Sequence, residues 1–142
     1  MDFVDDSLAV LTRTPSTLNA LLRGLPDEWI MATEGPGTWS PNVVVGHLIH
    51  GESRSFEPFD REAQFRDSDG KSLSALLDEF AALRQHSLER LRALSLQPEH
   101  LLLRGTHPAF GPVTVRQLLR HGRRTRSVTG RKWGLGASIF LY

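Results

Sequence analysis

The sequence contains no cysteine, and none of its apolar runs approaches the roughly 18–20 residues that a membrane-spanning helix needs. The lack of cysteine excludes disulfides, cysteine-ligated zinc and thiol nucleophiles, and it is typical of proteins from a reducing cytoplasm. The acidic start, Met1 to Asp6, lacks the basic region of a signal peptide. A glycine-rich phosphate loop and a Gly-x-Ser-x-Gly nucleophile motif are also missing. We therefore expect a cytoplasmic protein that does not act at a membrane.

Acidic residues are missing from the last part of the chain. All 16 of them lie at or before Glu99, whereas seven of the 17 basic residues follow residue 112. The net charge is therefore −6 for residues 1–112 and +7 for residues 113–142. Such a division is typical of a basic tail with an anionic partner. However, no aromatic residue interleaves the arginines before Trp133 and no DNA-binding motif surrounds them, so we expect no specific nucleic-acid function.

What the sequence does contain is helical periodicity, in a chain of 142 residues that suits one domain. Apolar residues recur at spacings of three and four, and no β-branched alternation is bounded by hairpin turns. Thr14-Pro15 and Ser40-Pro41 each place a capping residue before a proline, and Thr114 to Gln117 matches a capping box. The sequence thus predicts an all-α fold with helices over residues 14–24, 41–56, 72–95 and 114–119, joined by connectors over 31–38, 58–70 and 95–112. We expect one shared core, which contains Val44, Leu48, Leu76, Phe80 and Leu83.

Histidines are the best candidates for chemistry in a chain without cysteine. His47 points toward the core of the second predicted helix, where it either binds a ligand or packs against neighbours and caps a carbonyl. His50 lies three residues further on and either shares a two-histidine site with His47 or faces solvent together with Glu52. His86 is expected at the surface of the third helix.

Three other residues are weaker candidates for a functional role. His107 precedes the fourth helix, where we expect it to shape the connection, with a substrate-facing role as the alternative. Trp29 and Trp39 flank the 31–38 loop and are expected to pack as core or lid residues, or, for Trp39, to line a substrate site. His121 receives no role.

The run Trp39-Ser40-Pro41-Asn42-Val43-Val44-Val45-Gly46-His47-Leu48, together with Leu25 to Trp29 and Gly111 to Leu119, resembles the DinB-like superfamily of damage-inducible bacterial proteins. The resemblance covers about residues 5–119. It implies an antiparallel four-helix bundle with a divalent metal, zinc or nickel, held by three histidines. One of these comes from the second helix, and two, four residues apart, come from the fourth. Family members with assigned roles include thiol-dependent transferases, a mycothiol-dependent isomerase and proteins described as metal-dependent hydrolases.

The chain departs from the family pattern at two of the three metal positions. His47 matches the second-helix ligand, but the register from Leu118-Leu119 places the other two ligands at Thr125 and Thr129. We therefore expect metal binding to be weak or absent. Codons can be chosen for Arg120 to Arg131 such that a two-base shift yields a His-x-x-x-His motif at positions 125 and 129. A frameshift near residue 120 is thus our hypothesis for the basic, glycine-containing end.

These observations predict a bundle domain over residues 1–119, with an incomplete or atypical fourth helix, and a basic tail over residues 120–142. We expect the tail to be mobile and the domain to be marginally stable, because arginines replace the apolar stripe that would close the bundle. The predicted function is that of a DinB-like protein, ancestrally a metal-dependent transferase or hydrolase with a small-molecule or thiol substrate. The alternative is a non-enzymatic remnant or an interaction protein with a basic tail. A homodimer is a further expectation.

Overall fold

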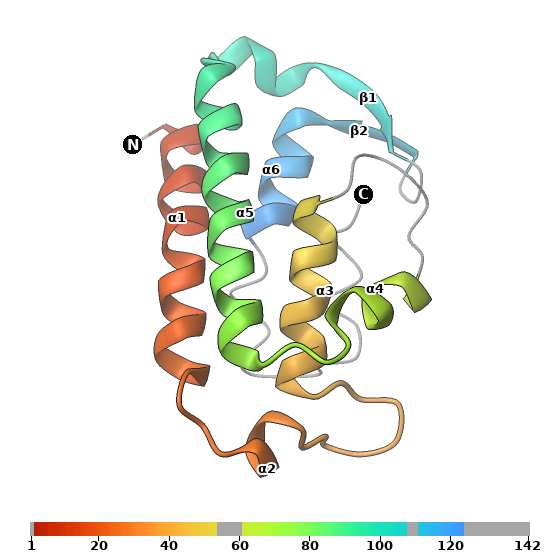
Figure 1. Cartoon of the computed structure of the whole chain (residues 1–142). Coiled ribbons are helices and arrows are strands. Elements are labelled where there is room, and N and C mark those ends of the chain that lie inside the picture. Colours follow the sequence, from red (N-terminus) through yellow and green to blue (C-terminus); the bar gives the residue numbers. More distant parts are fainter. Residues whose placement is uncertain (1, 54–60, 108–110, 124–142) are drawn as a thin grey trace.

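The computed structural model describes residues 2–53, 61–107 and 111–123, and these residues are mostly helical (Figure 1). In chain order the elements are α1 (Phe3–Leu22), α2 (Asp27–Ile30), α3 (Pro41–Ser53), α4 (Arg61–Ser68), α5 (Leu73–Ala93), the 3-10 helix η1 (Pro98–Leu102), β1 (Arg104–His107), β2 (Gly111–Thr114) and α6 (Val115–Arg123). Helices α1, α3, α5 and α6 form the bundle, so the predicted all-α four-helix architecture is confirmed. None of the described helices combines the length and apolar character of a membrane span.

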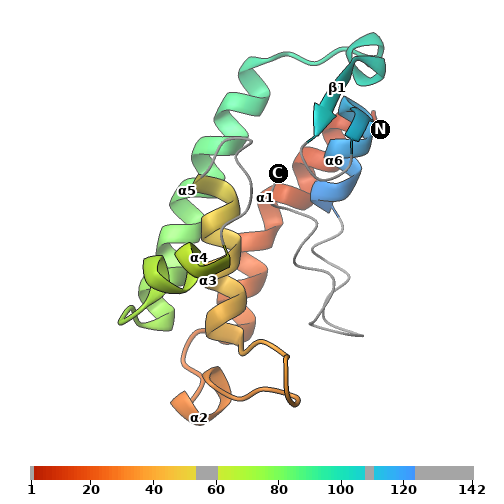
Figure 2. The same cartoon turned by 90° about the vertical axis from the view of Figure 1, so that its right-hand side faces the viewer.

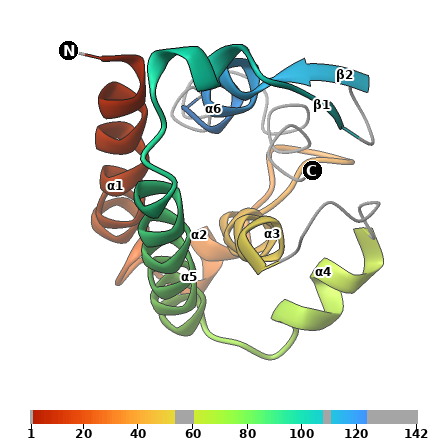
Figure 3. The same cartoon turned by 90° about the horizontal axis from the view of Figure 1, so that it is seen from above.

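The bundle helices run two in each direction. Helices α1 and α6 descend in Figure 1, whereas α3 and α5 ascend and are therefore parallel to each other. Helix α4, between them in sequence, packs against α3. Figure 2 shows the β1–β2 hairpin and α6 at one end of the bundle and α2 at the other. Viewed from above, α5 lies between α1 and α3, and α6 lies on the side away from α5 (Figure 3).

The core lies mainly between α3 and α5. Its buried members are Val45, Leu48, Ile49, Leu73, Leu76, Leu77 and Phe80, with Leu18, Leu22, Ile30 and Leu83 partly buried against them. Leu48, Leu76, Phe80 and Leu83 thus share one core, as the sequence predicted. Val44 is buried at 8% exposure but lies outside this cluster.

Helix α1 begins earlier than predicted. Thr14 and Pro15 were expected to start a helix, but they lie inside a continuous one, and the Thr14 hydroxyl donates to the Val10 carbonyl at 3.1 Å instead of capping. Proline inside a helix removes one backbone donor and disfavours the helix by about 3 kcal/mol. Packing of α1 against α5 and α6 outweighs this local preference. The predicted end is confirmed, because α1 stops at Leu22 and Gly24 follows with φ +82°.

Helix α3 is buried on every side rather than along one stripe. The Ser40 hydroxyl caps it by accepting from the Val43 N–H at 3.4 Å. Burial extends well beyond the predicted core residues Val44 and Leu48, because every residue from 44 to 50 is buried. A helix that is apolar all round belongs inside a protein rather than on its surface. Of the predicted range, residues 54–56 lie outside the described part of the chain.

Gly46 explains how closely α4 approaches α3. A Cβ atom added at Gly46 would lie 2.6 Å from the Ser68 Oγ and 2.8 Å from the Ser68 Cβ. Distances this short do not occur between real side chains, so the packing of α4 requires glycine here. The prediction of a connector over residues 58–70 was therefore wrong for residues 61–68, which form α4. The apolar pattern of residues 61–68 is too weak to predict a helix, and α4 packs against α3 at the contact between Gly46 and Ser68.

The predicted connector over residues 95–112 has secondary structure that the sequence did not predict. It contains η1 and an antiparallel hairpin with the register Arg104↔Thr114 and His107↔Gly111. Strand β1 reads Arg-Gly-Thr-His, three of whose residues are exposed, so it lacks the apolar alternation of a strand. The hairpin is stabilised by its backbone pairing and by the Val115 N–H donating to the Leu103 carbonyl at 3.0 Å.

The capping box at the start of α6 is confirmed. The Thr114 N–H donates to Gln117 Oε1 at 2.7 Å, and the Gln117 N–H donates to Thr114 Oγ1 at 3.2 Å. Helix α6 continues to Arg123, four residues beyond the predicted end at residue 119, and packs on α1, where the Arg116 guanidinium carbon lies 4.9 Å from the Phe3 ring centroid. The predictions for residues 124–142 fall outside the described residues.

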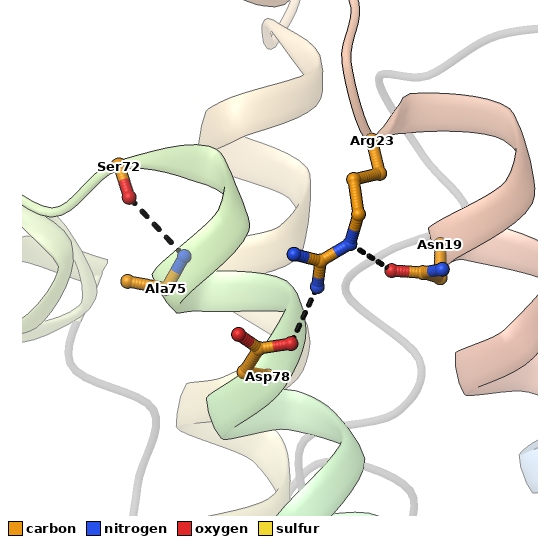
Figure 4. A network of polar contacts seen from close by, with 5 residues as sticks. All are labelled: Asn19, Arg23, Ser72, Ala75 and Asp78. Atoms are coloured by element: carbon orange, nitrogen blue, oxygen red, sulfur yellow. Dashed lines mark hydrogen bonds and ion pairs between the residues drawn. The ribbon is translucent and has the colours of Figure 1, made fainter.

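Helix α5 is held by a cap and by a polar link to α1. The Ser72 hydroxyl accepts from the Ala75 N–H at 3.2 Å, which confirms a helix start at the expected position. Figure 4 shows Arg23, just after α1, contacting Asn19 of α1 and Asp78 of α5. This link joins the lower ends of α1 and α5.

Candidate functional site

His47 lies in the interior of the bundle. It is in the middle of α3, and its exposed fraction is 0%. The Trp39 ring packs beside it, with the two ring centroids 4.6 Å apart and the ring planes tilted by 58°. The inward orientation predicted for His47 is therefore confirmed, whereas its role as a metal ligand stays a prediction.

His50 and Glu52 are not on a solvent-facing side of α3, as one reading of the sequence had them. His50 is only 2% exposed. Glu52 pairs with Arg84 of α5, whose Nε donates to Glu52 Oε1 at 2.7 Å while Nη2 lies 2.5 Å from the same oxygen. The side chains of Arg84 and Glu52 are 4% and 13% exposed, so this is a buried ion pair between two bundle helices.

Arg84 is a buried charged residue of α5, although a charged residue on an amphipathic helix is expected on the polar face. It lies four residues after Phe80 and four before Leu88, both buried, and that spacing was the signal that could have found it. Its guanidinium carbon is 5.1 Å from the Phe80 ring centroid. The Nη1 atom is buried and has no hydrogen-bond partner among the described residues.

The remaining histidines lie on four different elements, α5, η1, β1 and α6. His86 is exposed, as predicted, and His107 is 2% exposed at the end of β1. His121 is half-buried in α6. His100 was not among the candidate residues. Its Nδ1 atom accepts a hydrogen bond from the Gln97 N–H at 3.0 Å, so it caps η1.

The two tryptophans have different environments. Trp29 is 67% exposed on α2, so of the predicted core or lid packing the core alternative was wrong, and the lid alternative stays a prediction. Helix α2 has four residues, none of which is buried. Trp39 is half-buried and contacts His47.

Metal ligation requires several donors at one place. Within residues 2–53, 61–107 and 111–123, no three His, Cys, Asp or Glu residues are grouped so that they could hold a metal ion. The other two family positions, Thr125 and Thr129, lie outside these ranges. In the described part of the chain, His47 therefore lacks the companions of a three-ligand site.

Comparisons with known proteins agree with this fold. A search of curated proteins finds no significant match. Among solved structures, the chain is similar to YfiT from Bacillus subtilis, described as "a probable metal-dependent hydrolase with an unusual four-helix bundle topology". The TM-score is 0.71 at 19% identity, over 96% of this chain and 83% of YfiT, and at this identity the likeness shows the fold alone. The sequence model of the DinB superfamily matches residues 11–123, which is most of the chain, and the protein therefore belongs to the DinB superfamily.

Proposed function

We propose that this chain has the bundle of a metal-dependent DinB-like enzyme, of the thiol-dependent transferase or hydrolase type, with an incomplete metal-binding triad. The observation that carries the proposal is His47, a fully buried histidine at the second-helix ligand position without two grouped companions among the described residues. The description of YfiT as a probable metal-dependent hydrolase supports the ancestral chemistry. A small molecule or a thiol is the corresponding substrate class.

The donor set does not fit the family's three-histidine site. Zinc and similar ions are held in catalytic sites by three protein ligands with one position left open. Threonine hydroxyls at 125 and 129 are poor substitutes for imidazole nitrogens at neutral pH. Glu52, the acidic residue nearest to His47 in the sequence, is already paired with Arg84. The residues present therefore support loss of a tight metal site, and no catalytic step is assigned to a metal in this chain.

Metal titration of the purified protein tests the proposal. We expect calorimetry with zinc or nickel to show a Kd no tighter than about micromolar, because a single histidine is a weak site. His47→Ala should change this little, and His86→Ala, at an exposed position, serves as the matched control. A tight site with a stoichiometry of one that disappears in His47→Ala and persists in His86→Ala would refute the proposal.

The charge division favours a second candidate, a non-enzymatic interaction protein with a basic C-terminal segment. Residues 1–112 carry a net charge of −6 and residues 113–142 a net charge of +7. The nucleotide sequence of the native gene separates the two candidates. A reading frame in which a two-base shift near codon 120 restores histidines at 125 and 129 would make the basic segment a frameshift product and would favour the enzyme ancestry. An uninterrupted frame without that alternative would favour the interaction protein.

A further inference from the structure

Trp39 is held by ordered backbone on both sides. Before it, Thr38 closes a turn on Gly35, with the Thr38 N–H and hydroxyl donating to the Gly35 carbonyl at 3.1 and 2.7 Å. After it, Ser40 is 3% exposed and caps α3, where its carbonyl accepts from the Val44 N–H at 3.0 Å. The backbone at Trp39 is therefore held in position by a turn before it and a helix cap after it.

The Trp39 indole packs against the His47 imidazole. The centroid separation of 4.6 Å from His47 is at the close end of the range for aromatic pairs, and the tilt of 58° lies between stacked and edge-to-face geometry. His47 is 0% exposed and Trp39 is half-buried. Trp39 is therefore partly exposed and at the same time in contact with the fully buried imidazole.

We propose that Trp39 is a positioning residue for His47: its indole holds the imidazole in one orientation and shields it, so that a reagent or ligand reaches His47 only when the indole moves aside. The inference rests on the proposed function only in treating His47 as the functional position. The motion it requires is local, since Trp39 belongs to a loop while His47 belongs to a core helix. Loops that cover functional groups open at a lower free energy than core helices.

Chemical modification of the full chain, without metal, tests the shielding. Diethyl pyrocarbonate modifies accessible neutral imidazoles, and tandem mass spectrometry reads each histidine separately. Exposed His86 is the internal reference, and Trp29→Ala, which removes a 67% exposed indole, is the matched control. We expect Trp39→Ala to raise the modification rate of His47 relative to His86 by about tenfold, as removal of a protecting contact does. Trp39→Phe and Trp29→Ala should stay within about twofold of the original chain.

A spectroscopic measurement tests the contact between the two rings, on which the positioning depends, and does not require the alanine variant to fold. An indole 4.6 Å from an imidazole shifts the imidazole ring protons through its ring current. These resonances, assigned by their loss in His47→Gln, should move toward ordinary values in Trp39→Leu, which keeps apolar bulk, while those of His86 stay in place. Unchanged His47 resonances in Trp39→Leu, or unchanged His47 reactivity in a folded Trp39→Ala, would overturn the inference. Both readouts are made without metal, so discovery of a tight metal site would refute the proposed function and leave this inference standing.

Discussion

Glu52→Gln should lower the free energy of unfolding by about 3–5 kcal/mol, because it leaves the Arg84 guanidinium charged and without a counterion inside the bundle. Arginine cannot lose its proton in a protein, and the Arg84 side chain is only 4% exposed, so the charge cannot be relieved by titration or by water. At an effective dielectric constant of about 20, two unit charges about 4 Å apart attract by about 4 kcal/mol, which is the interaction that the substitution removes.

Replacing the other member of the ion pair, Arg84, should lower the free energy of unfolding by less. Arg84→Met leaves a carboxylate on Glu52, which is 13% exposed and can be hydrated, so we expect a loss of about 1–3 kcal/mol. Glu52→Leu combined with Arg84→Met should lie within about 2 kcal/mol of the original chain, because replacing both members of a buried pair by apolar residues is often neutral.

Urea denaturation of the single and double variants measures these differences. Lys71 and Glu79 supply a matched control, since they also form an ion pair, with Nζ and Oε2 2.7 Å apart, but their side chains are 40% and 37% exposed. Lys71→Met should lower the free energy of unfolding by less than about 1 kcal/mol. The reasoning is refuted if Glu52→Gln has no larger effect than Lys71→Met, or if the double variant is as unstable as Glu52→Gln.

Two further predictions concern packing and the metal site. Gly46→Ala should lower the free energy of unfolding by about 1–3 kcal/mol, since the new Cβ would meet the Ser68 side chain at 2.6 Å, and Ser68→Gly in the same chain should restore much of that loss in urea denaturation. An equal loss of stability in Gly46→Ala and in the double variant Gly46→Ala with Ser68→Gly would show that the contact with α4 is not the cause. Thr125→His with Thr129→His should not produce a tight zinc site by calorimetry, because the arginine-rich segment around them lacks the apolar stripe of a bundle helix. Submicromolar binding by this double variant would contradict the expectation.

Local sequence signals predicted the helices of the bundle well, where periodicity and capping agree. Ser72, with leucines at spacings of three and four behind it, predicted α5 to within two residues at each end. Thr114 and Gln117 predicted the start of α6. The same logic failed at Pro15, where the signal for a helix start lies inside a helix, because packing of α1 on its neighbours outweighs a local preference of a few kcal/mol. Helix α4 was not predictable from its own composition, since it packs against α3, and the hairpin was missed because β1 lacks the apolar alternation of a strand.

By itself, the sequence determined the fold class, the family and the inward orientation of His47, because these follow from short motifs and from the spacing of apolar residues. Only the tertiary structure decided which polar residues pair with each other inside the bundle. Arg84 and Glu52 are 32 residues apart, and nothing near either residue indicates its partner. The ring contact between Trp39 and His47 was likewise seen only in the structure, whereas Trp29 is 67% exposed. Burial of a charge or an indole depends on helices that pack from distant parts of the chain, and local periodicity carries no information about those partners.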